Sequence, residues 1–204
     1  MHDVASLIDE LRPYVADERV LDAVAAVPRE CFVPAGLRDR AYDNRALGIG
    51  CGQTISQPLV VARMSELLAP RPDARVLDVG TGSGYHAAVL ARLAGHVWSI
   101  ERHARLSRRA ARNLAAAGVR NVTLVVGDGT RGLPESAPFD AINVAAAGGV
   151  DALAELEAQL APGGRLVAPI TEPLQRLSLT RRTPAGLERE LLEEVRFVPL
   201  VRDD

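Results

Sequence analysis

The sequence predicts an α/β domain: a doubly wound, mostly parallel sheet with a helical cap before it and antiparallel strands at its end. Three observations support this class. Short apolar strands alternate with amphipathic helices from residue 75 onward, the connections between them are turns of a few residues, and the helical periodicity stops after residue 160. Strand–helix alternation with short turns implies right-handed crossovers between parallel strands. The 204 residues are enough for one domain with a substantial core.

The first third of the chain predicts three short helices and a long loop. Apolar residues repeat at helical spacing in each helix, and a proline or a capping Asp marks their ends. The helices are expected at Val4–Leu11, at Val20–Val24 after the cap Asp17, and at Pro58–Leu68, which has its proline in the first turn. Residues 27–52 are rich in Pro, Gly and Arg and predict packed loops.

From residue 75 the chain alternates between strands and helices. The expected strands are 75–79, 96–100, 122–126, 139–144 and 165–169. The expected helices are Tyr85–Leu93, one that contains Leu106, Ala110 and Leu114 and ends near Gly118, and one that contains Leu153, Leu156 and Leu160 before a turn at Pro162–Gly164. Leu174–Thr180 and Glu193–Val201 lack a helical pattern, so they are expected to pair as a hairpin-like antiparallel extension.

Composition excludes several classes of function. All 24 basic residues are arginine, which excludes Schiff-base chemistry and P-loop lysines. A net charge of −2 predicts no bulk attraction to nucleic acid or to an anionic membrane. Cys31 and Cys51 are too few for a disulfide framework, and no metal site is expected. The acidic start of the chain and the lack of a long apolar run predict neither a secretory signal nor a membrane span, so a cytoplasmic protein is expected.

A glycine-rich turn follows the first strand of the alternating region. Its glycines are Gly80, Gly82 and Gly84, spaced G-x-G-x-G. A dinucleotide site needs G-x-G-x-x-G, and in that register the third glycine position is Tyr85. A nicotinamide oxidoreductase is therefore disfavoured. Asp78, just before the turn, suits a cationic ligand better than a pyrophosphate.

Three carboxylates fall at the ends of three successive strands. Asp78 precedes the glycine turn, Glu101 ends the second strand, where it could accept hydrogen bonds from a ribose diol, and Asp128 follows the third strand, near an adenine ring. Each carboxylate taken alone is explained equally well as a polar cap of a strand end. The set in register fits a positively charged nucleoside, and S-adenosylmethionine, with an ammonium, a sulfonium and a ribose, is such a molecule.

Beyond this turn, the chain resembles the protein-L-isoaspartate O-methyltransferases over nearly its whole length. The stretch Gly52–Pro58, which reads Gly-Gln-Thr-Ile-Ser-Gln-Pro, and the tail Val195–Val201 are far more specific than the glycine turn. The other segments that carry the resemblance are Val27–Pro34, Arg38–Tyr42, Leu77–Tyr85 and Pro138–Ile142. The resemblance implies a Rossmann-like fold of the class I S-adenosylmethionine methyltransferases, in one domain of residues 1–204. Residues 1–73 are then a cap with the substrate motif, and residues 74–204 hold the cofactor-binding sheet and the C-terminal substrate edge.

The resemblance also implies an activity and the residues that perform it. The expected reaction methylates the free carboxylate of isoaspartyl residues in damaged proteins and peptides, with S-adenosylhomocysteine as the other product. Ser56 is implied as the active-site serine, with Thr54 beside it, and Leu200 and Val201 as the residues that flank the substrate backbone. The expected cofactor-binding residues are Gln53, Ile55, Asp78, Gly80, Thr81, Gly82, Gly84, Glu101, Arg102, Asp128 and Gly129.

Some positions depart from the family pattern: Gly48, Leu59, Val60, Asn143 and Thr171. The first three concern the substrate more than the cofactor. An enzyme that methylates an aspartate in a dedicated peptide is therefore an alternative, and a non-enzymatic binding module of the same fold is another. Ser56 can also be explained as a helix N-cap, a role compatible with facing a cleft. A carboxylate is already ionised at neutral pH, so no general base is expected.

Overall fold

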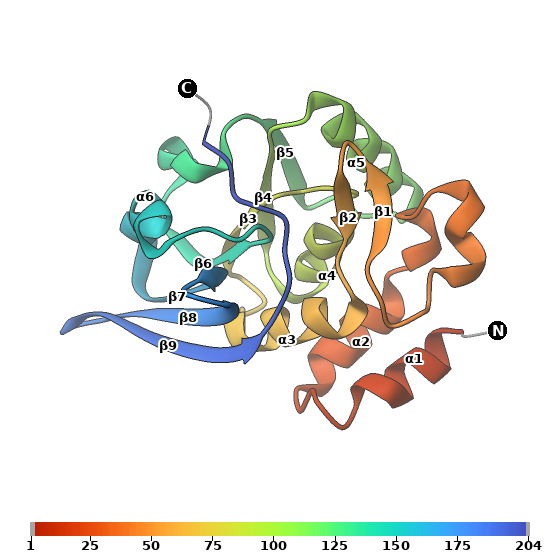
Figure 1. Ribbon diagram of the computed structural model, residues 1–204, viewed down its shortest axis with the longest axis horizontal. Helices are drawn as coiled ribbons and strands as arrows, with labels where there is room; N and C mark the ends of the chain where they lie inside the picture. The colour runs from red at the N-terminus through yellow and green to blue at the C-terminus, as the bar shows by residue number, and fades with distance from the viewer. Residues whose placement is uncertain (1–2, 203–204) are drawn as a thin grey trace.

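The computed structural model describes residues 3–202 and contains a seven-stranded sheet in the order β5-β4-β3-β6-β7-β8-β9. The strands from β5 to β7 pair in parallel, and β8 and β9 continue the sheet as an antiparallel hairpin (Figure 1). Their bounds are β3 Arg75–Val79, β4 His96–Glu101, β5 Val122–Val126, β6 Phe139–Val144, β7 Leu160–Thr171, β8 Gln175–Thr183 and β9 Gly186–Glu194. The predicted doubly wound, mostly parallel fold is confirmed.

The strand order creates a switch point between β3 and β6. From β3 the chain proceeds outward through β4 to β5, and it then returns to place β6 on the other side of β3. The two connections that leave β3 and β6 therefore diverge, which opens a crevice at the carboxyl ends of these strands. Ligands of open α/β sheets bind in such a crevice, so the topology alone indicates where the functional site lies.

Helices cover both faces of the sheet. On one face lie α3 (Pro58–Leu68) and α4 (Tyr85–Leu93), whose Met64, Leu68 and Leu90 pack against Val76 and Val167 of the strands. On the other face, Leu153 and Leu156 pack against Leu77 and Ile142. The first of these leucines ends η5 (Val150–Leu153) and the second lies in α6 (Ala154–Ala158). The strands β3, β6 and β7 are buried on both sides, as near-continuous apolar runs predict.

The N-terminal cap consists of α1 (Val4–Leu11), α2 (Glu18–Ala26) and a hairpin of two short strands. Asp3 and Asp17 cap the two helices by accepting hydrogen bonds from backbone amides of the first turn. The hairpin pairs β1 (Leu47–Gly50) with β2 (Gln53–Ile55) and lies near α5 (Ala104–Ala116). Strand β1, together with the 3-10 helices η1 (Arg29–Cys31) and η2 (Ala35–Arg40), lies within residues 27–52, where loops alone were predicted.

Two further predictions about elements were wrong. Leu160 does not belong to a helix, because α6 ends at Ala158 and Leu160 is the first residue of β7. The partner of β8 is β9, at Gly186–Glu194, so only the first residues of the predicted segment 193–201 lie beside β8. Within that segment, Pro199 forms one bridge with Ala147 beyond the end of β6, so the apolar tail lies across the sheet edge (Figure 1). No helix among residues 3–202 is long and apolar enough to cross a lipid bilayer.

Candidate active site

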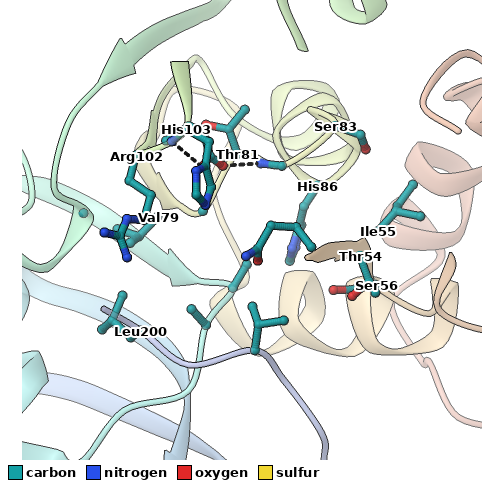
Figure 2. A pocket seen from close by; sticks show the side chains of 18 of the residues that line it. Thr54, Ile55, Ser56, Val79, Thr81, Ser83, His86, Arg102, His103 and Leu200 are labelled. Atoms are coloured by element: carbon teal, nitrogen blue, oxygen red, sulfur yellow. Dashed lines mark hydrogen bonds between the residues drawn. The ribbon is translucent and has the colours of Figure 1, made fainter. Parts of the chain in front are cut away.

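A cleft opens at the carboxyl ends of β3, β4 and β6, where the strand order predicts it (Figure 2). Five parts of the chain contribute expected residues to its walls: the hairpin with the residue after it, the glycine turn, the end of β4, the turn after β5 and the C-terminal tail. Their residues at the cleft include Gln53, Thr54, Ile55, Ser56, Gly80, Thr81, Gly82, Glu101, Arg102, Gly129, Leu200 and Val201. All twelve were expected from the sequence, and the structure brings them to one place.

The glycine turn passes close to β4 because its residues adopt left-handed backbone conformations. Gly80 has a φ of 96° and Gly82 a φ of 55°, values that side chains other than glycine rarely adopt. The Gly80 amide donates to the Ile100 carbonyl at 2.9 Å, which holds the turn against the neighbouring strand. The same turn leaves the Gly82 amide facing Glu101.

Glu101 lies at the floor of the cleft and is held from both sides. Its Oε2 accepts a hydrogen bond from the Gly82 amide at 2.8 Å, and its Oε1 accepts one from the His103 amide at 2.9 Å (Figure 2). The side chain is only 6% exposed. Each carboxylate oxygen can accept a further hydrogen bond. Glu101 is therefore an oriented acceptor, suited to a pair of neighbouring hydroxyl groups such as a ribose diol.

Three residues expected to bind the cofactor do not line the cleft. Asp78 is completely buried beneath the turn, where it accepts hydrogen bonds from Ser99 Oγ at 2.6 Å and from Asn143 Nδ2 at 2.7 Å. Burial raises its pKa, and the two hydrogen bonds oppose that shift. Asp78 was expected to face a cationic ligand, but in the structure its carboxylate lies beneath the glycine turn and does not reach the cleft.

The other two residues outside the cleft lining are Gly84 and Asp128, whose expected contact with the cofactor stays a prediction. Gly84 faces α5, and a Cβ there would lie 3.3 Å from both Ala110 and Leu114, so this glycine permits helix packing. Asp128 uses Oδ1 to cap η3 (Gly129–Arg131) by accepting from the amide and hydroxyl of Thr130. Its neighbour Gly129 does reach the cleft, and a Cβ there would approach Val79 to 2.6 Å.

Sequence reasoning missed the remaining residues of the cleft. They are Val61, Val79, Ser83, Tyr85, His86, Ile100, His103, Ala145, Ala146, Val198 and Pro199. A signal existed for some of them, because residues just beyond the ends of adjacent parallel strands meet at one edge of the sheet. Ala145 directly follows β6 in this way. Val61 and His86 carried no such signal, since each lies on a helix whose orientation depends on packing.

His86 belongs to a buried chain of polar side chains below the cleft. Its Nδ1 lies 3.1 Å from Asn143 Nδ2, and its Nε2 lies 3.2 Å from Ser65 Oγ. The amide nitrogen of Asn143 also donates to Asp78, so the unusual Asn143 links the glycine turn to α3. Because an amide nitrogen only donates, His86 accepts at Nδ1, and its ring is neutral. Burial lowers the pKa of His86 to about 3.

This low pKa predicts how stability changes with pH. The pKa of His86 in the unfolded chain is ~6.5. The contribution of this histidine to the free energy of unfolding is therefore complete above that pH, and it is lost as the pH falls toward about 3. Between pH 6.5 and 5, we expect the wild type to lose about 2 kcal/mol more unfolding free energy than His86→Gln. Urea unfolding at the two pH values measures this difference, and parallel losses in the two proteins would contradict it.

Comparisons with known proteins show the family to which this chain belongs. The protein-L-isoaspartate(D-aspartate) O-methyltransferase (PCMT) family matches residues 2–204. This chain belongs to that family. Protein-L-isoaspartate O-methyltransferases of Rhodospirillum centenum and Methylorubrum extorquens are 50% and 54% identical to it, over 93% and 92% of this chain and 86% and 82% of their own lengths.

Solved structures of the family share the fold. A protein-L-isoaspartate O-methyltransferase aligns over 97% of this chain with a TM-score of 0.86 and 31% identity, and this chain spans 65% of that one. A Plasmodium falciparum protein described as a putative member is 25% identical, with a TM-score of 0.84 and full coverage of both chains, and its crystal structure is a complex with S-adenosyl-L-homocysteine. S-adenosylmethionine is accordingly the cofactor of this family.

Proposed function

We propose that this protein transfers a methyl group from S-adenosylmethionine to the free carboxylate of L-isoaspartyl residues in damaged proteins and peptides. One observation carries this proposal: the cleft that contains the glycine turn and Glu101 also contains Ser56 and the tail residues Leu200 and Val201. The cofactor residues and the segments that resemble the substrate-binding parts of the family therefore share one site, although they lie far apart in the sequence.

The residues present fit the cofactor. Glu101 offers a fixed pair of acceptors for the ribose hydroxyls. Gly129 packs too closely against Val79 to carry a side chain, so only its backbone borders the cleft there. Thr81 and Gly82 of the turn line the same wall, and Asp78 lies too deep to touch the ligand. When bound, the cofactor supplies a methyl group on a positively charged sulfur. The chain must then place the attacking oxygen in line with that group and exclude water from it.

A second groove next to the cleft accommodates the peptide. It shares Thr54, Ser56, Ala145 and Val198 with the cleft and continues along residues 194–197. Ser56 thus lies where the two spaces meet. An ionised carboxylate needs no general base, so we assign Ser56 Oγ the role of a hydrogen-bond donor that orients the carboxylate. The resulting ester is expected to close to a succinimide without help from the protein.

A paired-peptide assay tests the proposal. The protein is incubated with methyl-labelled S-adenosylmethionine and one of two peptides that differ only in Asp versus isoAsp at one position. We expect base-labile methyl ester in the isoAsp peptide, and label at background level in the Asp peptide. Label in the Asp peptide alone would contradict isoaspartyl specificity and favour the alternative enzyme with a dedicated aspartyl substrate. Absence of label in both peptides would contradict the proposal.

A further inference from the structure

Among residues 3–202, Arg29 is one of the largest completely buried side chains, and the reaction described above makes no use of it. It lies in η1, in the N-terminal cap. Within the part of the chain that the structure describes, no carboxylate forms an ion pair with the guanidinium of Arg29, and burial lowers the pKa of this group. An unpaired buried charge costs several kcal/mol, and a hydrophobic side chain of similar volume would avoid that cost. The presence of a guanidinium here therefore calls for a physical reason.

The contacts of Arg29 supply that reason, because its planar group joins three segments of the chain, two of which line the cleft. Its Nε donates to the Ala41 carbonyl at 2.9 Å, and its Nη2 donates to the Ser56 carbonyl at 2.7 Å. The guanidinium carbon lies 4.5 Å from the ring centre of Tyr85, the first residue of α4 and part of the cleft wall. Its Nη1 is buried without a hydrogen-bond partner among the described residues.

We infer that Arg29 is a positioning residue for Ser56, an inference that rests on the role proposed for that serine. The hydrogen bond to the Ser56 carbonyl fixes the peptide plane between Ser56 and Gln57, directly before α3 begins at Pro58. The second donor anchors the guanidinium to the cap, and the ring of Tyr85 anchors it to the cofactor side. The direction of the Ser56 side chain is thereby coupled to the wall that holds the cofactor.

The fork of the guanidinium explains why arginine occupies the position. Two donors in a rigid plane can reach two carbonyls of different segments at once, and the same plane stacks on an aromatic ring. A lysine would keep the charge but would present a single nitrogen at the end of a flexible stem. We therefore expect Arg29→Lys to restore only part of the function that Arg29→Met loses.

A double-mutant cycle with Ser56 tests this inference. Arg29→Met, Ser56→Ala and the double variant are compared for kcat and KM with an isoAsp peptide, for S-adenosylhomocysteine affinity and for thermal midpoint. We expect Arg29→Met alone to lower kcat about 10-fold or more while cofactor affinity stays within about threefold. In the Ser56→Ala background, the same change should lower kcat less than about threefold, because the group that Arg29 positions is already absent.

The matched control replaces Arg38, an exposed arginine of the same cap, by methionine. Arg38→Met should leave kcat unchanged.

The cycle distinguishes a role of Arg29 in positioning Ser56 from a general contribution of Arg29 to folding. Equal losses from Arg29→Met with and without Ser56 would overturn the inference, as would a loss of activity that only follows the folded fraction. If Arg29→Met does not fold, Arg29→Lys carries the same cycle, and full activity of the Lys variant would overturn the need for the fork. Unchanged activity of Ser56→Ala would instead contradict the proposed role of Ser56. A Ser56 effect without an Arg29 effect would contradict this inference alone.

Discussion

Replacement of Ser56 by alanine is expected to lower kcat/KM for an isoAsp peptide about 10- to 100-fold, because a hydrogen bond to a charged group contributes ~1.5–3 kcal/mol. Ser56 lies where the cofactor cleft meets the peptide groove, so the lost donor would have oriented the carboxylate. The alanine variant keeps the backbone carbonyl that Arg29 holds, and the local fold is expected to persist. Steady-state kinetics with the isoAsp peptide measure the loss.

The cofactor affinity of this variant separates the two halves of the site. Calorimetry with S-adenosylhomocysteine is expected to show a dissociation constant within about twofold of the wild-type value, since the role we propose for the serine is to bind the substrate and not the nucleoside. Ser136→Ala, far from the cleft, provides the control for serine removal in general. Full turnover of Ser56→Ala would remove this residue from the mechanism.

Replacement of Glu101 by alanine is expected to weaken S-adenosylhomocysteine binding about 10- to 100-fold, since two hydrogen bonds to a carboxylate are lost. The substitution also releases the Gly82 and His103 amides, so part of the loss comes from a less ordered glycine turn. Glu101→Gln keeps the shape of the side chain and one acceptor oxygen, and its loss is expected to be smaller. Calorimetry measures both variants, and the thermal midpoint confirms that each is folded.

An analogue of the ligand distinguishes a contact with the ribose from a general effect on the turn. Wild-type protein should bind the 2′-deoxy analogue of S-adenosylhomocysteine more weakly than the parent compound. In Glu101→Ala, removal of that hydroxyl should cost much less, because its acceptor is already gone. Equal penalties in both proteins would refute the assignment of Glu101 to the ribose, and Glu135→Ala serves as an exposed carboxylate control.

Local patterns determined much of this protein. The period of the apolar residues and the cap at Asp17 are enough to place most of the helices and the parallel strands, since they reflect interactions within a few residues. The spacing of the glycine turn and the position of Glu101 at the end of β4 are enough to locate one side of the cleft, because the carboxyl ends of parallel strands meet at one edge. The family resemblance supplied the other side, Ser56 with the C-terminal tail.

The tertiary structure alone decided which polar groups touch the cleft and which lie beneath it. Asp78 and Glu101 both end or nearly end a strand, yet one is sealed under the turn by Ser99 and Asn143 while the other lines the cleft. That difference depends on the pleat and on partners far away in sequence, which no local pattern contains. The same holds for Arg29, whose partner Ser56 lies 27 residues away, and for β9, whose pairing with β8 depends on the turn between them. Contacts between residues far apart in the sequence therefore decided which carboxylate lines the cleft and which segment pairs with β8, because the local sequence does not distinguish these alternatives.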